Sequence, residues 1–455
     1  MESRQAEGAR KAQYEKMTRT SIPKLIALLS VPTILSMLVT NIYNLVDTAF
    51  VGRLGTSQSG AVGVIFGFMS IIQAVGFMFG QGAGSIMARC LGAQDEETAS
   101  RTASTGLFFS FSLGLVISLV TLPLRDQIVR LLGSTETIAP HARAYLDWIL
   151  IAAPFMTGGY TLNNLLRYEG KASLGMVGLM VGAVLNIALD PLLMFTFGLG
   201  LAGAAIATAS SQIISFFILL SMFLRGRTSV RLSPRKIQPT SLGVIMTTGL
   251  PSMLRQALNS IATILLNSSA APFGDEAVAA MSIVSRISFF VFALALGIGQ
   301  GFQPVSAFNY GAGKFARLRK AFRVTVIMSE GAILIAAAVC FLLSGQLIGV
   351  FRNDPRVIEI GVRALRLQMA TVIFLPFTMC AEMLYQSTGH RLGASFMSSA
   401  RSGLFFIPTL LILSRLRGLS GIQEAQPIAY LLAVPLSAAF ILHFMRALPK
   451  EDKPD

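Results

Sequence analysis

Residues 174–198 read LGMVGLMVGAVLNIALDPLLMFTFG, a continuous run in which Asp190 is the only charged side chain. About 20 apolar residues are enough to cross a bilayer as a helix. Asn186 and Asp190 are four residues apart, so in a helix their side chains lie on one face. A carboxylate is costly inside a membrane, and its default interpretation there is a functional site. The stretch therefore predicts a membrane-spanning helix that carries a buried polar site.

Similar apolar runs recur along the whole chain. Of its 455 residues, 53% are hydrophobic and only 13% are charged, whereas soluble proteins average about 25% charged residues. The runs are continuous and lack the alternation of a transmembrane barrel. We predict an all-α polytopic membrane protein with twelve transmembrane helices, at residues 22–50, 58–86, 99–123, 143–166, 174–198, 200–224, 242–271, 277–307, 320–345, 360–386, 393–414 and 426–446.

The distribution of basic residues predicts the orientation of these helices. Of the 37 Lys and Arg, 24 lie in or at the edge of segments on the side of the N-terminus, and 10 lie on the other side. Cytoplasmic loops of membrane proteins carry this excess, which explains the net charge of +15 without a nucleic-acid partner. We predict a multi-pass protein of the plasma (inner) membrane with both termini in the cytoplasm.

The two halves of the chain resemble each other at one constant offset in residue number. The shift that takes Pro32 onto Pro251 also takes Gly55 onto Gly274. Parallel repeats of this kind occur in transporters, where two matching halves move about a central site. The predicted parts are a cytoplasmic tail (1–21), an N-terminal six-helix lobe (22–224), a cytoplasmic linker (225–241), a C-terminal six-helix lobe (242–447) and a second tail (448–455).

Helix packing inside the first lobe is predicted from glycines. Gly76, Gly80 and Gly84 recur every four residues in the second span, so they share one face. Small residues on one face let membrane helices approach closely. The neighbouring sequence GQGAG at residues 80–84 is not preceded by a strand, so it is not interpreted as a nucleotide-binding loop.

Polar residues gather in two spans of the first lobe. Thr40, Tyr43, Asn44 and Asp47 share one helical face of the first span. The fifth span offers Asn186, Asp190 and the Ile187 carbonyl, which Pro191 frees from its helical bond, and the sixth offers Thr208. Two carboxylates with amide, hydroxyl and carbonyl oxygens suit a hard cation or a shared proton. At the offset of the repeat, Asp47 and Asp190 meet Leu266 and Thr409, so this site belongs to the N-terminal lobe.

These residues and three motifs resemble the multidrug and toxic compound extrusion (MATE) family. The motifs are YNLVDTAFVG at residues 43–52, GAQ at 92–94, and LN at 185–186 followed by DP at 190–191 and GLGLAGAA at 198–205. The likeness covers all twelve spans and is closest to the DinF-like and MepA-like branches. It implies a MATE-type fold and polyspecific export of organic, mostly cationic compounds against an inward flow of Na⁺ or H⁺.

By the same resemblance, Asp47, Asn186, Asp190 and Thr208 match the coupling site for a cation or proton, with Tyr43 beside it. These four residues would hold sodium, if sodium is used. Another branch of the family uses a Glu in the seventh span, where this chain has Arg255. A coupling site in the second lobe is therefore in doubt, and Glu382 is its possible acid, although a salt bridge or packing is the favoured interpretation of Glu382.

The substrate cavity is predicted from amides and flexible apolar side chains. An amide inside a span needs a hydrogen-bond partner, and methionines suit loose recognition. The first candidates are Asn44, Asn163, Asn164 and Met180, and further apolar candidates are Phe155, Met176, Met281, Phe289 and Phe292. No enzymatic activity and no cofactor besides the coupling ion are expected. The expected partners are small organic substrates and membrane lipid, with a monomeric protein.

Two alternatives remain open at this point. A lipid-linked oligosaccharide flippase of the same broad superfamily would need a basic cavity, for which Arg255, Arg286 and Arg401 are available. An intramembrane aspartyl protease would use two membrane Asp residues that share a proton, but it does not explain the repeat. The sequence also leaves sodium and proton coupling undecided.

Overall fold

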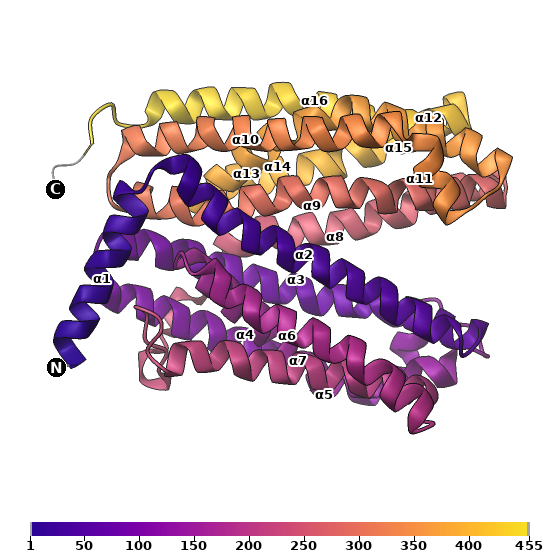
Figure 1. Ribbon diagram of the computed structural model, residues 1–455, viewed down its shortest axis with the longest axis horizontal. Coiled ribbons are helices and arrows are strands. Elements are labelled where there is room, and N and C mark those ends of the chain that lie inside the picture. The colour runs from indigo at the N-terminus through magenta and orange to yellow at the C-terminus, as the bar shows by residue number, and fades with distance from the viewer. Residues whose placement is uncertain (1, 453–455) are drawn as a thin grey trace. The chain divides into compact units, whose positions relative to one another are not determined.

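The computed structural model describes residues 2–452, with side chains from residue 11 onward, and every regular element in this range is a helix. Ten of the described helices are long and apolar enough to cross a membrane. The other two predicted spans coincide with α5 (Ala139–Tyr168) and α8 (Leu242–Ala270), which are not among those ten. The prediction of an all-α polytopic membrane protein is confirmed, and Figure 1 shows the long helices that dominate it.

The chain divides into two compact units, of which the first comprises Met1–Lys16 and Leu35–Met253. Within it α5 packs against α3, α4, α6 and α7 and so forms its centre. The elements up to this point of the chain are α1 (Glu2–Arg19), α2 (Ile22–Gly52), α3 (Thr56–Gly92), α4 (Glu96–Leu131), α5, α6 (Ala172–Pro191), the π-helical segment η1 (Leu192–Thr196), α7 (Gly200–Leu224) and the 3-10 turns η2 (Pro234–Lys236) and η3 (Pro239–Ser241).

The second unit comprises Met17–Ile34 and Leu254–Asp455. In it α9 packs against α10, α12 and α13, and α16 packs against α12, α13 and α15. Its elements are α8, η4 (Ala271–Phe273), α9 (Asp275–Gly311), α10 (Phe315–Leu342), α11 (Ser344–Phe351), α12 (Pro355–Thr371), η5 (Val372–Phe374), α13 (Leu375–Thr388), α14 (Arg391–Ser399), the π-helical η6 (Ala400–Phe405), α15 (Phe406–Arg417) and α16 (Leu419–Ala447).

The chain passes between the units in α1 after Lys16, in α2 after Ile34 and in α8 after Met253. The boundaries in α2 and α8 each lie two residues beyond the proline inside that helix, Pro32 or Pro251. The limits of the tails, lobes and linker that the sequence suggests stay a prediction, and residues 453–455 of the second tail lie outside the described range.

The internal repeat appears in the element bounds themselves. Helices α3 and α9 are each 37 residues long, and the first residue of α9, Asp275, lies at the offset of the repeat from the first residue of α3, Thr56. The same offset separates the starts of α4 and α10, α6 and α14, and α7 and α16. Gly55 and Gly274 precede α3 and α9 with φ values of 140° and 98°. Only glycine adopts such angles without strain, so the repeat extends to the local geometry of this turn.

The glycine face of α3 makes the close helix contact that its sequence predicts, and the partner helix is α5. A Cβ atom added to Gly76 would stand 2.7 Å from Cβ of Tyr160, and one added to Gly84 would stand 2.4 Å from Cδ2 of Tyr168. These distances are shorter than van der Waals contact, so a larger residue would push the two helices apart. The close α3–α5 contact holds the helices that surround the polar site of this unit.

The first helix of the chain is tied to the first unit by a buried carboxylate. Glu169, directly after α5, has no exposed surface. Its Oε1 atom accepts from Lys171 Nζ at 2.7 Å and from the Ser229 backbone N–H at 2.5 Å. Gln13 of α1 donates to the Glu169 backbone carbonyl and accepts from the Ser229 hydroxyl at 3.0 Å. Burial raises the pKa of the Glu169 carboxyl, and the ion pair with Lys171 opposes that shift.

Candidate functional site

Four predicted polar residues of the first unit form one buried cluster. Asp47 comes from α2, Asn186 and Asp190 from α6, and Thr208 from α7, and none is more than 8% exposed. Asn186 Nδ2 donates to Asp190 Oδ1 and to Thr208 Oγ1, at 3.3 Å in each case. The carboxyl groups of Asp47 and Asp190 are close enough to interact directly with each other. We call these four residues the acid cluster.

The acid cluster has more acceptors than donors. Among the described residues, Asp47 Oδ1, Asn186 Oδ1 and Asp190 Oδ2 are buried and accept no hydrogen bond. Two carboxyl groups in contact at a buried site cannot both stay charged unless a cation lies between them, and without a cation they share a proton. A buried acceptor atom that makes no hydrogen bond lowers the stability of the fold, and a bound proton or cation would remove this cost. The arrangement is therefore suited to bind and release one positive charge.

The donor set of the acid cluster is made of oxygen. The described residues contain no group of three or more His, Cys, Asp or Glu side chains that could hold a metal ion. Two carboxylates, an amide oxygen and a hydroxyl are ligands for a hard cation rather than for a transition metal. A sodium ion would fit this chemistry, and so would a proton shared by the two carboxyl groups.

Local sequence explains how α6 and α7 bring these groups together. Asn186 and Asp190 lie one turn apart, and α6 ends at Pro191, which has no N–H to donate. The π-helical segment η1 follows at once, and α7 lies so close to it that a Cβ atom on Gly203 would stand 2.7 Å from the Leu193 carbonyl carbon. This close approach places Thr208 within reach of Asn186.

Two tyrosines complete the surroundings of the acid cluster. Tyr43, which was predicted, interacts electrostatically with Asp47 and Asp190. Tyr145 of α5, which was not predicted, is 1% exposed, hydrogen-bonded to Thr208, and interacts with both carboxyl groups. The sequence contains no signal for Tyr145, because its neighbours three and four residues away on the buried side are apolar.

The predicted cavity residues are not part of the acid cluster. Asn164 is buried, and it donates to the Tyr160 carbonyl at 2.7 Å and accepts from Arg167. Asn44, Asn163 and Met180 are half-buried. Of the apolar candidates, Phe155, Phe289 and Phe292 make contacts with other aromatic rings, and Met281 lies in the hydrophobic core of the second unit. Their assignment to a substrate cavity stays a prediction.

Glu382 lies in a second buried cluster, which belongs to the second unit. Its Oε1 atom is 2.5 Å from Nη1 of Arg255 on α8, and its Oε2 atom is 3.8 Å from Nη1 of Arg401 in η6. All three side chains are at most 6% exposed. We call these three residues the arginine cluster. The favoured interpretation of Glu382 as a salt-bridge residue agrees with this geometry.

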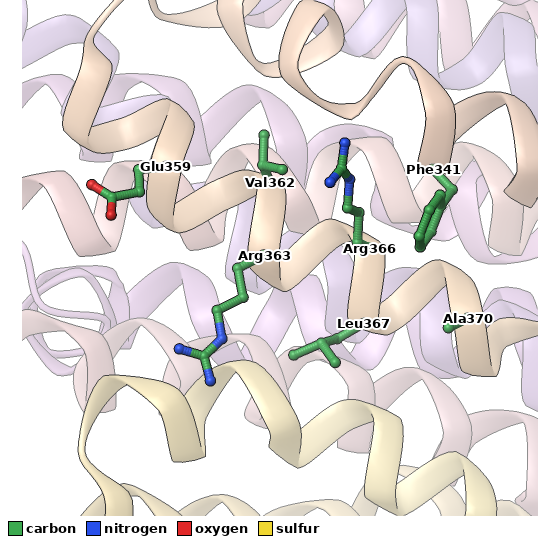
Figure 2. Close-up of a pocket in the computed structure, with 7 residues that line it drawn as sticks. All are labelled: Phe341, Glu359, Val362, Arg363, Arg366, Leu367 and Ala370. Carbon is green, nitrogen blue, oxygen red and sulfur yellow. The ribbon is translucent and has the colours of Figure 1, made fainter.

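A pocket of about 600 Å³ lies apart from both clusters, at α10 and α12 (Figure 2). Figure 2 shows the side chains of Arg366 and Arg363 extending in opposite directions from α12. Arg366 donates to Ser344 Oγ at 3.0 Å and lies 5.4 Å from the centre of the Phe341 ring, and Arg363 is 3.7 Å from Glu424. Because both guanidinium groups already have partners, this pocket is not a candidate for the coupling site.

Two matching sets of membrane-spanning helices, one of which holds a buried ionisable cluster, define a membrane transporter. Comparison with known proteins assigns this transporter to a family. Residues 32–192 and 251–412 each match the MatE family. The two matches begin at Pro32 and Pro251, which are the residues that the repeat pairs with each other.

Individual relatives match over almost the whole chain. Multidrug export protein MepA of Staphylococcus aureus (strain N315) is 31% identical over 422 residues, which are 92% of each chain. The protein of the same name from Staphylococcus saprophyticus is 28% identical over 96% of each chain. The outward-facing conformation of a multidrug resistance MATE family transporter of the MOP superfamily superimposes with a TM-score of 0.90 at 28% identity, covering 96% of this chain and 98% of the other. The chain belongs to the MatE family.

Proposed function

We propose that the protein is a secondary active antiporter that exports structurally diverse, mainly cationic organic compounds in exchange for Na⁺ or H⁺. The observation that carries this proposal is the acid cluster, a buried all-oxygen site with unused acceptors in a membrane-spanning unit. The names of the relatives, which are multidrug export proteins, support the substrate class. The proposed location is the plasma (inner) membrane, with both termini cytoplasmic and a monomeric protein.

The chemistry of the cluster supplies the coupling. When no ion is bound, Asp47 and Asp190 repel each other and are poorly solvated, which favours the uptake of a proton or a cation. Binding neutralises the pair and changes the position that α2 prefers, because Asp47 lies on α2 beyond Pro32. An ion can shift a conformational equilibrium only through different affinities for the two states. We assign that difference to the acid cluster, and the two lobes then alternate in a rocker-switch cycle.

The proposal is tested in vesicles that contain the purified full-length protein. Export of a cationic dye is measured under a Na⁺ gradient alone and under a pH gradient alone, because the acid cluster suits either ion. We expect one of the two gradients to drive export and Asp47→Asn to reduce it to the level of vesicles without protein. Export by Asp47→Asn at the wild-type rate, or export that neither gradient drives, would contradict the proposal.

The three arginines that suggested the flippase alternative do not form a basic cavity of their own. Arg255 and Arg401 both lie beside Glu382, and Arg286 is exposed on α9. The same vesicles distinguish the two functions, since a flippase would move a lipid-linked oligosaccharide and leave the cationic dye in place.

A further inference from the structure

The arginine cluster carries one positive charge more than it can balance. Arg255, Glu382 and Arg401 are 5%, 1% and 3% exposed, and two guanidinium groups share a single carboxylate. Arginine does not lose its proton in proteins, so the excess charge cannot be removed by titration. A buried charge without a counter-charge is strongly destabilising. The cluster is therefore incomplete without an anion.

Arg401 is the member of the cluster whose donors are unused. Glu382 lies closer to Arg255, at 2.5 Å, than to Arg401, at 3.8 Å, which is too long for a hydrogen bond. Among the described residues, Arg401 Nη2 is buried and donates to nothing. The guanidinium lies 5.9 Å from the centre of the Phe292 ring. Contact with a ring face leaves the donors at the edge of the guanidinium plane available to a ligand.

Neighbouring polar groups extend the site toward accessible surface. Asn259 lies one turn after Arg255 on α8, so the two side chains share a face. Its Oδ1 atom accepts at 2.7 Å from the hydroxyl of Ser402, the residue that follows Arg401, and this bond leaves the N–H groups of the Asn259 amide as donors. Unlike the three charged residues, Asn259 is only half-buried. Asn259 therefore connects Ser402, beside the buried Arg401, to a partly exposed position on α8.

The backbone at Arg401 also departs from regular helix. Residues Ala400–Phe405 form the π-helical segment η6 between α14 and α15. Single π-helical turns inside α-helices occur frequently at functional sites. Here the π-helical turn carries Arg401 next to Ser402, whose hydroxyl donates to Asn259 on α8.

We propose that Arg401 and Asn259 bind the carboxylate of a zwitterionic organic substrate. A guanidinium fork binds a carboxylate through two parallel hydrogen bonds, and the amide of Asn259 adds a third donor. This inference rests on the proposed export function and refines its substrate class. The acid cluster of the first unit handles one positive charge, whereas the arginine cluster of the second unit selects substrates that also carry a negative one.

Two dyes that differ in a single group test the inference. Tetramethylrhodamine carries a carboxylate beside its cationic rings, and in its methyl ester this charge is masked. Binding of both dyes to the purified full-length protein is measured by fluorescence polarisation for the wild type, Arg401→Gln and Arg401→Lys. Arg286→Gln is the matched control, because it removes an arginine of the same unit that lies outside the cluster and is exposed.

We expect Arg401→Gln to weaken the binding of tetramethylrhodamine about tenfold, as loss of a charge-assisted hydrogen bond does, while the methyl ester changes by less than about twofold. Arg401→Lys keeps the charge without the fork and should give an intermediate loss, which provides the test if the Gln variant does not fold. Arg286→Gln should leave both affinities unchanged. Equal losses of affinity for the two dyes, or no loss for either, would overturn the inference. The proposed function is tested separately in the vesicle assay, where failure of the wild type to export the methyl ester under either gradient would refute it.

Discussion

The acid cluster and the arginine cluster are both buried among membrane-spanning helices, but they are balanced in opposite ways. The acid cluster holds two carboxyl groups in contact and no basic side chain, and three of its acceptors are unused. The arginine cluster holds two guanidinium groups around one carboxylate, and its unused atoms include donors of Arg401. One unit therefore offers a place for a cation and the other a place for an anion.

Only the residues of the acid cluster can change their charge during an exchange of ions. The carboxyl groups of the acid cluster can change their charge by gaining or losing a proton or a cation. The arginines cannot change theirs, so the arginine cluster is constant in charge and can respond only to the charge of a ligand. Substitution in the acid cluster should consequently affect transport more than stability, and substitution of the shared carboxylate in the arginine cluster should do the reverse.

The largest expected effect is that of Asp190→Asn on coupled export. Without Asp190 the cluster keeps one carboxylate and no longer requires a shared proton or cation, so export should fall to the level of vesicles without protein. The melting temperature should stay at or above that of the wild type, because a buried like-charge contact is removed. Dye export and thermal unfolding of the same preparation measure both quantities.

Asp147→Asn is the control for this substitution. Asp147 lies in the same unit but pairs with Arg125 at a partly exposed site, at 3.0 Å. Exposed ion pairs contribute little stability, and this one is not part of the acid cluster. If Asp190→Asn and Asp147→Asn have the same effect on export, the acid cluster has no special role.

The second prediction concerns Glu382→Gln, which leaves two buried arginines without a counter-charge. Removing one partner of a buried ion pair costs about 3–5 kcal/mol, so we expect a large drop in melting temperature or loss of folded protein. Glu424→Gln is the matched control, because Glu424 also lies between two arginines, Arg363 and Arg417, which are 56% and 61% exposed. The control substitution should lower the free energy of unfolding by at most about 1 kcal/mol. Equal losses for the two variants would show that the buried arginines do not depend on Glu382 more than the exposed ones depend on Glu424.

Local spacing predicted the acid cluster well and the arginine cluster poorly, for a physical reason. Asn186 and Asp190 are one turn apart, and Asp47 stands out because carboxylates are costly in a membrane. Glu382 and Arg255 are 127 residues apart on different helices, so no periodicity connects them. The spans and their repeat follow from hydropathy and a constant offset, but the irregular segments do not: the predicted helices at 360–386 and 393–414 are interrupted by η5 and η6.

A third prediction uses Tyr145, the residue of the site that the sequence did not indicate. Tyr145→Phe removes the hydroxyl that bonds to Thr208 and leaves the ring in place. A neutral hydrogen bond contributes about 1 kcal/mol, so the ion concentration that gives half-maximal export should shift by roughly fivefold while the maximal rate is kept. Tyr385→Phe in the second unit, which removes a hydroxyl bonded to the Phe440 carbonyl at 2.6 Å, should not shift it. A shift caused by both variants would show that the effect does not come from the acid cluster.

The smallest expected effect concerns Glu169, a fourth buried carboxylate, which lies outside the membrane spans and pairs with Lys171. Because burial raises its pKa above the ordinary 4.5, the folded protein holds this proton more tightly than the unfolded chain does. Its contribution to stability is complete below pH 4.5 and is lost as the pH rises through the higher value. Relative to Glu169→Gln, the melting temperature of the wild type should therefore fall between low and neutral pH.

Glu169→Gln keeps an acceptor for the Ser229 N–H and removes only the charge. Glu136→Gln removes one charge from an exposed position and serves as its control. If the difference in melting temperature between the wild type and Glu169→Gln stays constant with pH, the ion pair with Lys171 fully offsets the cost of burying the Glu169 carboxylate. Glu169 would then resemble Glu382, whose charge is held by basic neighbours, and not the acid cluster, whose charge is free to change.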